Sequence, residues 1–263
     1  ASDDKTLKLW DLATGSQRAT FMWFDIYAKP LAITPDGKQA VSASRDYTLK
    51  LWDLATGSQL ATFRDSESVR AVAITPDGKQ AVSASGRTLT LWDLATGSQL
   101  ATFMWFDIYA KPLAITITPD GKQALKQGFS EFYDTLKLWD LATGSQLATF
   151  MWHNGSRSYE KTVAITPDGK QAVSASGRTL TLWDLATGSQ LATFRGHWGE
   201  VNAVAITPDG KQAVSASGRT LKLWDLATGS QLATFKGHSS KVNAVAVTTD
   251  GKQAVSASGG ILK

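Results

Sequence analysis

The sequence predicts an all-β protein made of six four-stranded antiparallel units, and two repeated motifs support this fold class. A Trp-Asp dipeptide recurs every 40 to 47 residues, at Trp10, Trp52, Trp92, Trp139, Trp183 and Trp224. An Asp-Gly-Lys motif lies in each interval and after the last, at Asp36, Asp77, Asp120, Asp168, Asp209 and Asp250. Internal repeats of this length indicate that each repeat is one structural unit.

Each unit reads as four short strands, here called a to d in chain order. In one unit the segments are VNAVAIT (201–207), QAVSAS (212–217), TLKLWDL (220–226) and SQLATF (230–235). Their period-two alternation and their β-branched residues are typical of strands. The Pro-Asp-Gly and Ala-Thr-Gly-Ser junctions contain residues that tolerate positive φ, so we expect a hairpin turn at both. Each unit is therefore expected to be an antiparallel meander.

Composition excludes several functional classes. With 43% hydrophobic residues and no apolar run of the roughly 18 to 20 residues that span a bilayer, we expect a soluble globular protein without a membrane or targeting segment. The absence of cysteine excludes a disulfide framework and leaves the compartment open. The net charge is only +4, and six lysines belong to the repeated turn, which argues against a nucleic-acid partner.

The order of these motifs resembles the WD-repeat β-propeller family. Gly-His, VNAVAIT, Asp-Gly-Lys and TLKLWD follow one another in the family's order, and the resemblance covers essentially the whole chain. The resemblance implies a six-bladed β-propeller, one domain over residues 1–263, with strand a innermost and strand d outermost in each four-stranded blade.

The two ends of the chain are expected to complete one blade together. The sequence begins at a strand c, Thr6–Leu12, and strand b of the last unit is Gln253–Ser258. We therefore predict that strands c and d from the N-terminus pair with strands a and b from the C-terminus. The tail 259–263 (GGILK) duplicates the start of strand c at residues 4–8, so we expect it to fray or to be the swapped element.

The resemblance also implies a structural role for two histidines. In the family, the histidine of a Gly-His pair belongs to a buried hydrogen-bonded set with a strand-b serine, an aspartate of the b–c turn and the strand-c tryptophan. His197 and His238 stand in such pairs. Candidates for every partner exist only for His238, as Ser256, Asp4 and Trp10.

Sequence variation is concentrated in two of the four junction types. The a–b and c–d turns are nearly invariant, whereas the d–a and b–c connections vary, the longest b–c connection being expected between Leu125 and Thr135. In a meander these two variable connections emerge at the same end of the sheet. We therefore expect one face to carry the function and the other to be scaffold.

Aromatic residues are enriched in these variable connections. Because aromatic side chains dominate interface hot spots, we interpret them as a partner-binding face. The candidate residues are Trp23, Phe24, Tyr27, Tyr47, Trp105, Phe106, Tyr109, Phe129, Phe132, Tyr133, Trp152, Tyr159 and Trp198. Alternatively, they pack on one another over the channel. The repeated strand-c tryptophans and strand-d phenylalanines are instead expected to be core residues between blades.

Charged residues in the connection after Phe63 have a less specific interpretation. Arg64, Asp65, Glu67 and Arg70 indicate either a solvated loop or a polar rim around a binding surface.

No catalytic residue, metal site or cofactor is predicted. The sequence contains no GxSxG elbow, P-loop or Rossmann glycine pattern, and its three histidines are scattered. We therefore expect a non-enzymatic protein without cofactor, nucleic-acid or membrane partners. It is expected to be a monomer, with self-association through the aromatic face left open.

The near-identity of the units is typical of consensus repeat construction. The segment MWFDIYAKPLAIT occurs twice, at residues 22–34 and 104–116, inside otherwise standard units. We interpret the chain as an engineered scaffold whose redesigned connections bind a protein or peptide. Two alternatives stay open: a structural design that tests grafting, pocket formation or self-assembly without an outside target, and a natural propeller with recently duplicated blades.

Overall fold

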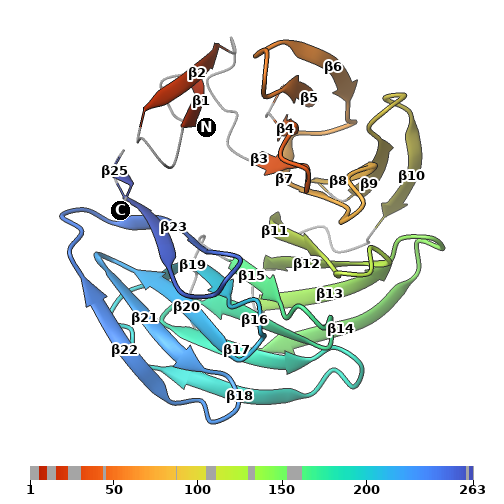
Figure 1. The fold of residues 1–263 in the computed structure, drawn as a ribbon. Coiled ribbons are helices and arrows are strands. Elements are labelled where there is room, and N and C mark those ends of the chain that lie inside the picture. Colours follow the sequence, from red (N-terminus) through yellow and green to blue (C-terminus); the bar gives the residue numbers. More distant parts are fainter. Residues whose placement is uncertain are drawn as a thin grey trace. The chain divides into compact units, whose positions relative to one another are not determined.

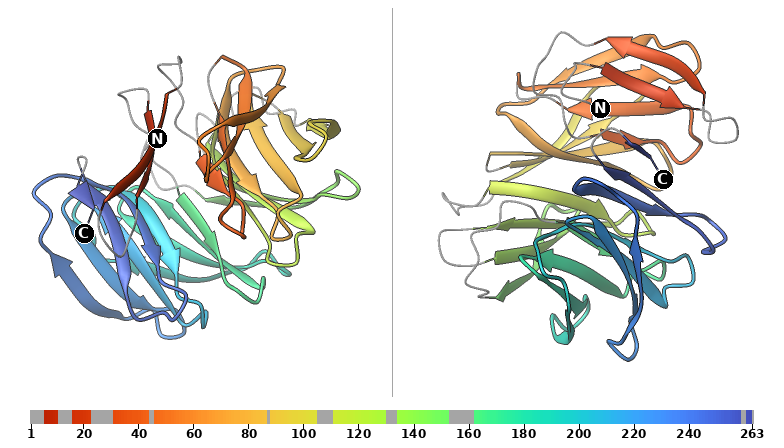
Figure 2. Two further views of the ribbon diagram at one scale, coloured as in Figure 1. Left: turned by 45° about the horizontal axis from the view of Figure 1, so that its top comes forward. Right: turned by 90° about the vertical axis from the view of Figure 1, so that its left-hand side faces the viewer.

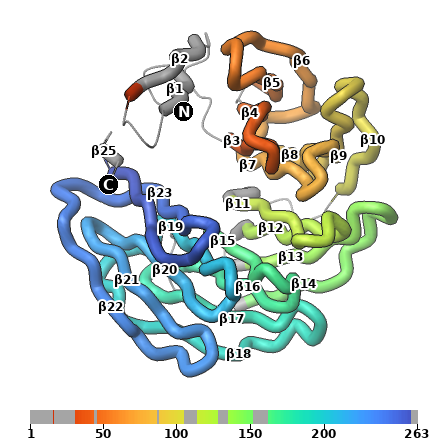
Figure 3. Tube along the Cα trace, in the orientation of Figure 1, coloured from red at the N-terminus to blue at the C-terminus, as the bar shows by residue number. Residues whose placement is uncertain are grey.

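The computed structural model describes residues 6–10, 16–22, 31–43, 46–86, 88–104, 111–129, 134–152, 162–258 and 261–262. Figure 3 shows the chain coloured by residue number. Within these ranges, no helix is long and apolar enough to cross a membrane.

The described strands form seven sheets: five with four strands, one with three and one with two. In each four-stranded sheet the strands lie in chain order, as Figure 1 shows. The predicted all-β fold and the predicted meander of strands a, b, c and d are therefore confirmed. The two views of Figure 2 show the same arrangement, with the blue strands of residues 201–236 side by side.

The residue contacts divide the chain into two compact units. Unit 1 comprises Ala1–Ile117, Gly121–Ala124 and Asp140–Ser145, and unit 2 comprises the remainder. The sheets wholly within unit 1 contain β1 (Thr6–Trp10), β2 (Gln17–Met22), β3 (Leu31–Ile33), β4 (Gln39–Ala43), β5 (Thr48–Asp53), β6 (Gln59–Arg64), β7 (Val69–Ile74), β8 (Gln80–Ser85), β9 (Thr88–Asp93) and β10 (Gln99–Met104). The predicted single closed domain stays a prediction.

A further four-stranded sheet has residues in both units. Its strands are β11 (Lys111–Ile117), β12 (Gln123–Phe129), β13 (Asp134–Asp140) and β14 (Gln146–Trp152). The sheets wholly within unit 2 contain β15 (Thr162–Ile165), β16 (Gln171–Ser176), β17 (Thr179–Asp184), β18 (Gln190–Arg195), β19 (Val201–Ile206), β20 (Gln212–Ser217), β21 (Thr220–Asp225), β22 (Gln231–Lys236), β23 (Val242–Val247), β24 (Ala254–Ser258) and β25 (Ile261–Leu262).

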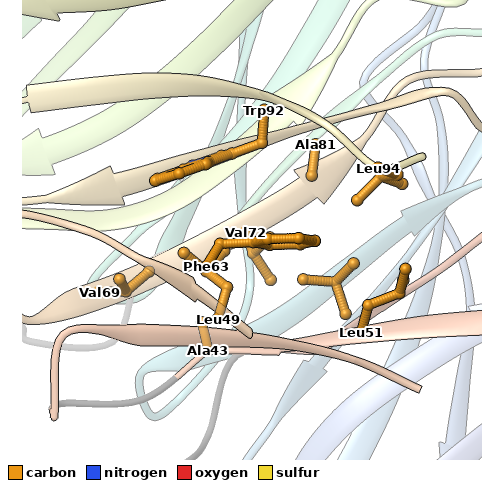
Figure 4. Close-up of a cluster of buried hydrophobic side chains, with 10 residues drawn as sticks. Ala43, Leu49, Leu51, Phe63, Val69, Val72, Ala81, Trp92 and Leu94 are labelled. Carbon is orange, nitrogen blue, oxygen red and sulfur yellow. The ribbon is translucent and has the colours of Figure 1, made fainter. Parts of the chain in front are cut away.

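The hydrophobic core lies between successive sheets. In unit 1, Leu49 and Phe63 of the β3–β6 sheet pack with Val72, Ala81 and Trp92 of the β7–β10 sheet. Figure 4 shows these side chains meeting between the two sheets. The rings of Phe63 and Trp92 are stacked with their centroids 5.9 Å apart. The alternating apolar residues of each strand thus bury one face against the neighbouring sheet.

The same aromatic contact recurs in unit 2. Phe150 lies 5.6 Å from Trp183 between ring centroids, and Phe194 lies 5.8 Å from Trp224. All four side chains are buried. The prediction that the strand-c tryptophans and strand-d phenylalanines form the inter-blade core is confirmed at these positions.

Within each unit, the first strand of one sheet contacts the first strand of the next sheet. β3 contacts β7 in unit 1, and β19 contacts both β15 and β23 in unit 2. This convergence of the first strands agrees with the expectation that strand a is the inner strand of each sheet.

The last sheet corrects the expectation that the tail frays, and the predicted closure stays a prediction. Ile261 and Leu262 do not fray: they form β25, which pairs with Ser258 and Ala257 of β24. The register matches that of the preceding sheet, where Ser217 pairs with Thr220. Among the described residues, β1 and β2 pair only with each other, so the predicted pairing of N-terminal with C-terminal strands is not found.

Loop closure explains why the tail occupies this position. Only two residues separate β24 from β25, whereas the N-terminal strand lies more than 240 residues away along the chain. The entropic cost of joining two strands grows with the length of the intervening loop. The tail also carries the strand-c sequence, so it occupies the same register without a mismatch.

Two equivalent phenylalanines should differ in their effect on stability. Phe194 is 2% exposed against Trp224, whereas Phe235, at the same position of the next sheet, is 48% exposed. We expect Phe194→Ala to lower the free energy of unfolding by about 3 to 5 kcal/mol. Phe235→Ala should cost less than about 1 kcal/mol. Urea denaturation of both variants measures the difference, and equal losses would mean that Phe235 is covered in solution.

Candidate functional site

The invariant a–b turn is held by a threonine and an aspartate. In the turn after β19, the Thr207 hydroxyl donates to Asp209 Oδ1 at 2.6 Å, and the Lys211 amide donates to the same oxygen at 3.0 Å. These two donors hold the pKa of the Asp209 carboxyl below its usual range. The Gln212 amide completes the turn by donating to Thr207 Oγ1.

The invariant c–d turn is also held by hydrogen bonds between a threonine and an aspartate. The amide and hydroxyl of Thr228 both donate to Asp225 Oδ1, which lowers the pKa of that carboxyl. Gly229 has φ of +73°, a conformation that other residues adopt only with strain. The Leu226 amide donates to Lys211 O, so the two invariant turns lie together at one end of the sheet. Each turn is therefore fixed by its own backbone chemistry, which agrees with a scaffold role.

The variable connections lie together at the opposite end of the sheets. The amide of Asp65, in a d–a connection, donates to the Tyr47 carbonyl of the preceding b–c connection at 2.7 Å. In unit 2, the amide of Val201, the residue that follows a d–a connection, donates to Gly177 O of a b–c turn at 2.7 Å. The prediction that both variable connections emerge at one end is confirmed for these sheets.

Two of the thirteen candidate aromatic residues have described side chains, and both are exposed. Trp198 is 91% exposed and Tyr47 is 53% exposed. The backbones of Phe129 and Trp152 end β12 and β14. The other candidates lie outside the described residues: Trp23, Phe24, Tyr27, Trp105, Phe106, Tyr109, Phe132, Tyr133 and Tyr159.

Tyr47 has an unusual backbone conformation. Its φ is +70°, the left-handed region, and it is the only described residue other than glycine with positive φ. This conformation costs a non-glycine residue roughly 1 kcal/mol or more. In the two-residue b–c turns of other sheets, the residue with positive φ is glycine, as at Gly177 and Gly218. A strained, half-exposed tyrosine is therefore a candidate contact residue.

His197 belongs to the buried set that the family resemblance implied. Its Nε2 lies 2.6 Å from Ser215 Oγ, and Trp224 Nε1 donates to the same oxygen at 2.7 Å. Burial, together with the charge of Lys222, lowers the pKa of His197 to about 4. The neutral imidazole can then accept the serine proton through Nε2. The role of His197 is structural.

His238 makes only part of the corresponding set. Its Nε2 lies 2.7 Å from Ser256 Oγ, as predicted. The proposed partner Asp4 lies outside the described residues, and of Trp10 only the backbone is described.

The structure corrects the expectation that Asp65 lies in a solvated loop or a polar rim. Its carboxylate is buried and accepts hydrogen bonds from the hydroxyls of Ser83 and Ser85, each at 2.7 Å. Ser83 in turn accepts the Trp92 indole N–H at 2.9 Å. Asp65 therefore takes the place that His197 and His238 have in the last two sheets. The sequence signal was present but missed: this unit keeps both strand-b serines and lacks Gly-His. Arg64, Glu67 and Arg70 are exposed.

The predicted long connection at Leu125–Thr135 is also shorter than expected. β12 continues to Phe129, and Leu125, Lys126 and Gln127 are buried in it. Lys126, at 1% exposure, stands where the other sheets have the strand-b serine. Gln127 Nε2 donates to Ala175 O at 2.9 Å in unit 2. A buried lysine and a buried glutamine replace small residues here. Because these residues are polar, the sequence did not indicate that β12 continues through them.

The described residues contain no group of three or more His, Asp or Glu side chains that could hold a metal ion. His153 lies outside them.

Comparison with known families gives one match. A family described as WD domain, G-beta repeat matches residues 31–53, 57–93, 144–184, 188–225 and 229–263, more than half of the chain. A comparison with curated proteins found no match.

The buried His197 should make stability depend on pH. Its pKa is about 4 in the fold and near 6.5 in the unfolded chain, so the unfolded state binds more protons between these values. The free energy of unfolding should therefore fall as pH is lowered from about 6.5 to 4, by on the order of 2 kcal/mol. His197→Asn should remove this part of the dependence. If the free energy of unfolding of the wild type and of the variant depends on pH in the same way, His197 is not the group responsible.

Proposed function

Because the chain belongs to the WD domain, G-beta repeat family, we propose that it is a non-catalytic scaffold that binds a protein or peptide through its variable connections. Proteins of this family commonly act as interaction scaffolds. In the proposed arrangement, the b–c and d–a connections supply the contact residues, and the invariant turns at the opposite end supply stability.

The exposed indole of Trp198 is the observation that carries this proposal. Folding does not require Trp198, because 91% of its surface is exposed to solvent. A tryptophan of this exposure leaves a large apolar surface in water, which a partner would bury. Trp and Tyr are also the residues that most often dominate binding energy in interfaces.

Exposed methionines at the same end of the sheets support the proposal. Met104 ends β10 and is 66% exposed, and Met151, in β14, is similarly exposed. Methionine is flexible and polarizable, so it adapts to a partner's surface. Each leads into a connection that carries candidate aromatic residues.

An engineered consensus origin is part of this proposal. It is supported by the repetition of exposed turns, such as ITPDGKQAVSAS, and by the duplicated segment at residues 22–34 and 104–116. Hydrogen bonds and positive φ constrain only some positions of these turns, so independent evolution of the repeats would diversify the other exposed side chains.

The proposal predicts that face variants lose binding without losing stability. A phage-displayed library of random peptides selected on the immobilised protein should yield binders. We expect Trp198→Ala to weaken these binders about 30-fold, the loss for an anchor of about 2 kcal/mol. Tyr47→Gly should weaken binding while raising the melting temperature, because it removes the left-handed strain.

Lys211→Ala, at the invariant end, is the matched control and should leave affinity unchanged. Selected peptides that bind all variants equally would contradict the assignment of the face. A selection that enriches no peptide would favour a structural design without an outside target.

A further inference from the structure

Positive and negative charges in unit 2 lie at opposite ends of its sheets. Within residues 162–258, every aspartate lies in or beside an invariant turn, at Asp168, Asp184, Asp209, Asp225 and Asp250. Each a–b turn in this range also holds one lysine, so the aspartates outnumber the lysines. The invariant end of these sheets is therefore net acidic.

The variable end of the same sheets carries a basic cluster. We use this name for four exposed residues, Arg178, Arg195, Arg219 and Lys236. Two of them lie in the b–c turns before β17 and β21, and the other two are the last residues of β18 and β22. Within residues 162–258, Glu200 is the one acidic residue at this end. The variable end is therefore net basic.

The strand register places the cations of each sheet next to one another. Arg195 pairs with Thr179, the residue that follows Arg178. In the next sheet, Lys236 lies in the same way beside the turn that contains Arg219. Paired strands are about 5 Å apart, so each sheet presents two neighbouring positive charges. Among the described residues, none of these four side chains forms an ion pair.

The connection that carries Trp198 joins these two sheets. It begins directly after Arg195, and at its end the Val201 amide donates to Gly177 O, in the turn that contains Arg178. The indole is 91% exposed. This surface thus combines a large apolar side chain with positive charges that have no acidic partner.

We propose that the basic cluster and Trp198 bind an acidic peptide segment, a run of Asp and Glu residues that includes an apolar side chain. The apolar side chain packs on the Trp198 indole, and the carboxylates lie against the basic cluster. Complementary charge of this kind speeds association and excludes partners of the wrong sign. The acidic invariant end repels a longer polyanion that would extend along the sheets, so a short segment fits. This inference rests on the proposed function and adds the chemistry of the partner.

Fluorescence anisotropy with three labelled peptides tests this proposal on the full-length protein. The acidic probe is rhodamine-GEEDFLDEEG-amide. Its neutral counterpart has Gln and Asn in place of Glu and Asp, and its basic counterpart has Lys at these positions. We expect saturable binding of the acidic peptide only. Raising sodium chloride from about 20 mM to about 500 mM should weaken this binding about tenfold, because salt screens exposed charges.

Two double variants locate the charge that matters. Arg178→Gln combined with Arg219→Gln should weaken binding of the acidic peptide about fivefold, the scale of two exposed ion pairs. Lys170→Gln combined with Lys211→Gln is the matched control, because it removes the same charge at the invariant end, and it should leave affinity unchanged. All four side chains are exposed, so both variants should keep the wild-type melting temperature. Trp198→Ala should weaken binding about 30-fold.

Four results would overturn the proposal. The first is equal binding of the acidic and neutral peptides. If this binding still depends on Trp198, the proposed function stands and only the acidic partner is wrong. The second is equal weakening by the two double variants, which would mean that only the total charge matters. The third is tighter binding of a labelled oligothymidine, which would indicate a nucleic-acid partner.

The fourth result is no saturable binding of the acidic peptide. If the phage selection still yields peptides that depend on Trp198, only the acidic partner is wrong. If the selection also enriches no peptide, the proposed function fails as well.

Discussion

The contact between a strand-c tryptophan and the strand-d phenylalanine of the preceding sheet is the interaction that joins successive sheets. It occurs with ring centroids 5.6 to 5.9 Å apart in three described pairs. The indole N–H is buried at the same time, and a strand-b serine accepts it, as Ser174 does from Trp183 at 2.9 Å. An unpaired indole N–H would cost about 1 to 3 kcal/mol, so the serine also contributes to the stability of the contact.

This contact also explains why the two ends of the sheets differ in sequence. At the invariant end, a β-carbon added to Gly97 would lie 3.0 Å from the Phe63 ring, and Gly97 has φ of +75°. The turn is therefore constrained both by its own conformation and by the aromatic core. At the other end, backbone hydrogen bonds such as that between Asp65 and Tyr47 hold the connections together. Buried side chains such as Asp65 and His197 are also held there by strand-b serines, whereas exposed side chains such as Trp198 are free to change.

The repeats made most of the fold predictable from sequence. Strand order, hairpin turns and core aromatics follow from period-two patterns and turn residues, because these are local properties of the chain. The structural role of His197 followed from the family resemblance. The sequence was less informative where a residue of a different type takes the place in the fold that the other repeats give to histidine or serine. Asp65 replaces a histidine through a connection of different length, and Lys126 lies buried where serine was the rule.

At the chain ends, two segments of similar sequence could fill the same strand position, and this limited the prediction. Residues 4–8 and 259–263 both carry the start of strand c, and pattern alone does not rank them. Loop closure does: β25 continues directly from β24, whereas β1 forms a two-stranded sheet with β2. The short tail fills two positions of the strand. The candidate binding face was predictable only as a set of connections, since exposure and strain at Trp198 and Tyr47 depend on the fold.

A double-mutant cycle on Phe150 and Trp183 tests the central claim most directly. The free energies of unfolding of Phe150→Leu, Trp183→Phe and the double variant give the coupling between the two rings. If the inter-sheet aromatic contact holds neighbouring sheets together, the coupling energy should be about 1 kcal/mol, the scale of a buried aromatic pair. Additive effects, within about 0.3 kcal/mol, would contradict this account.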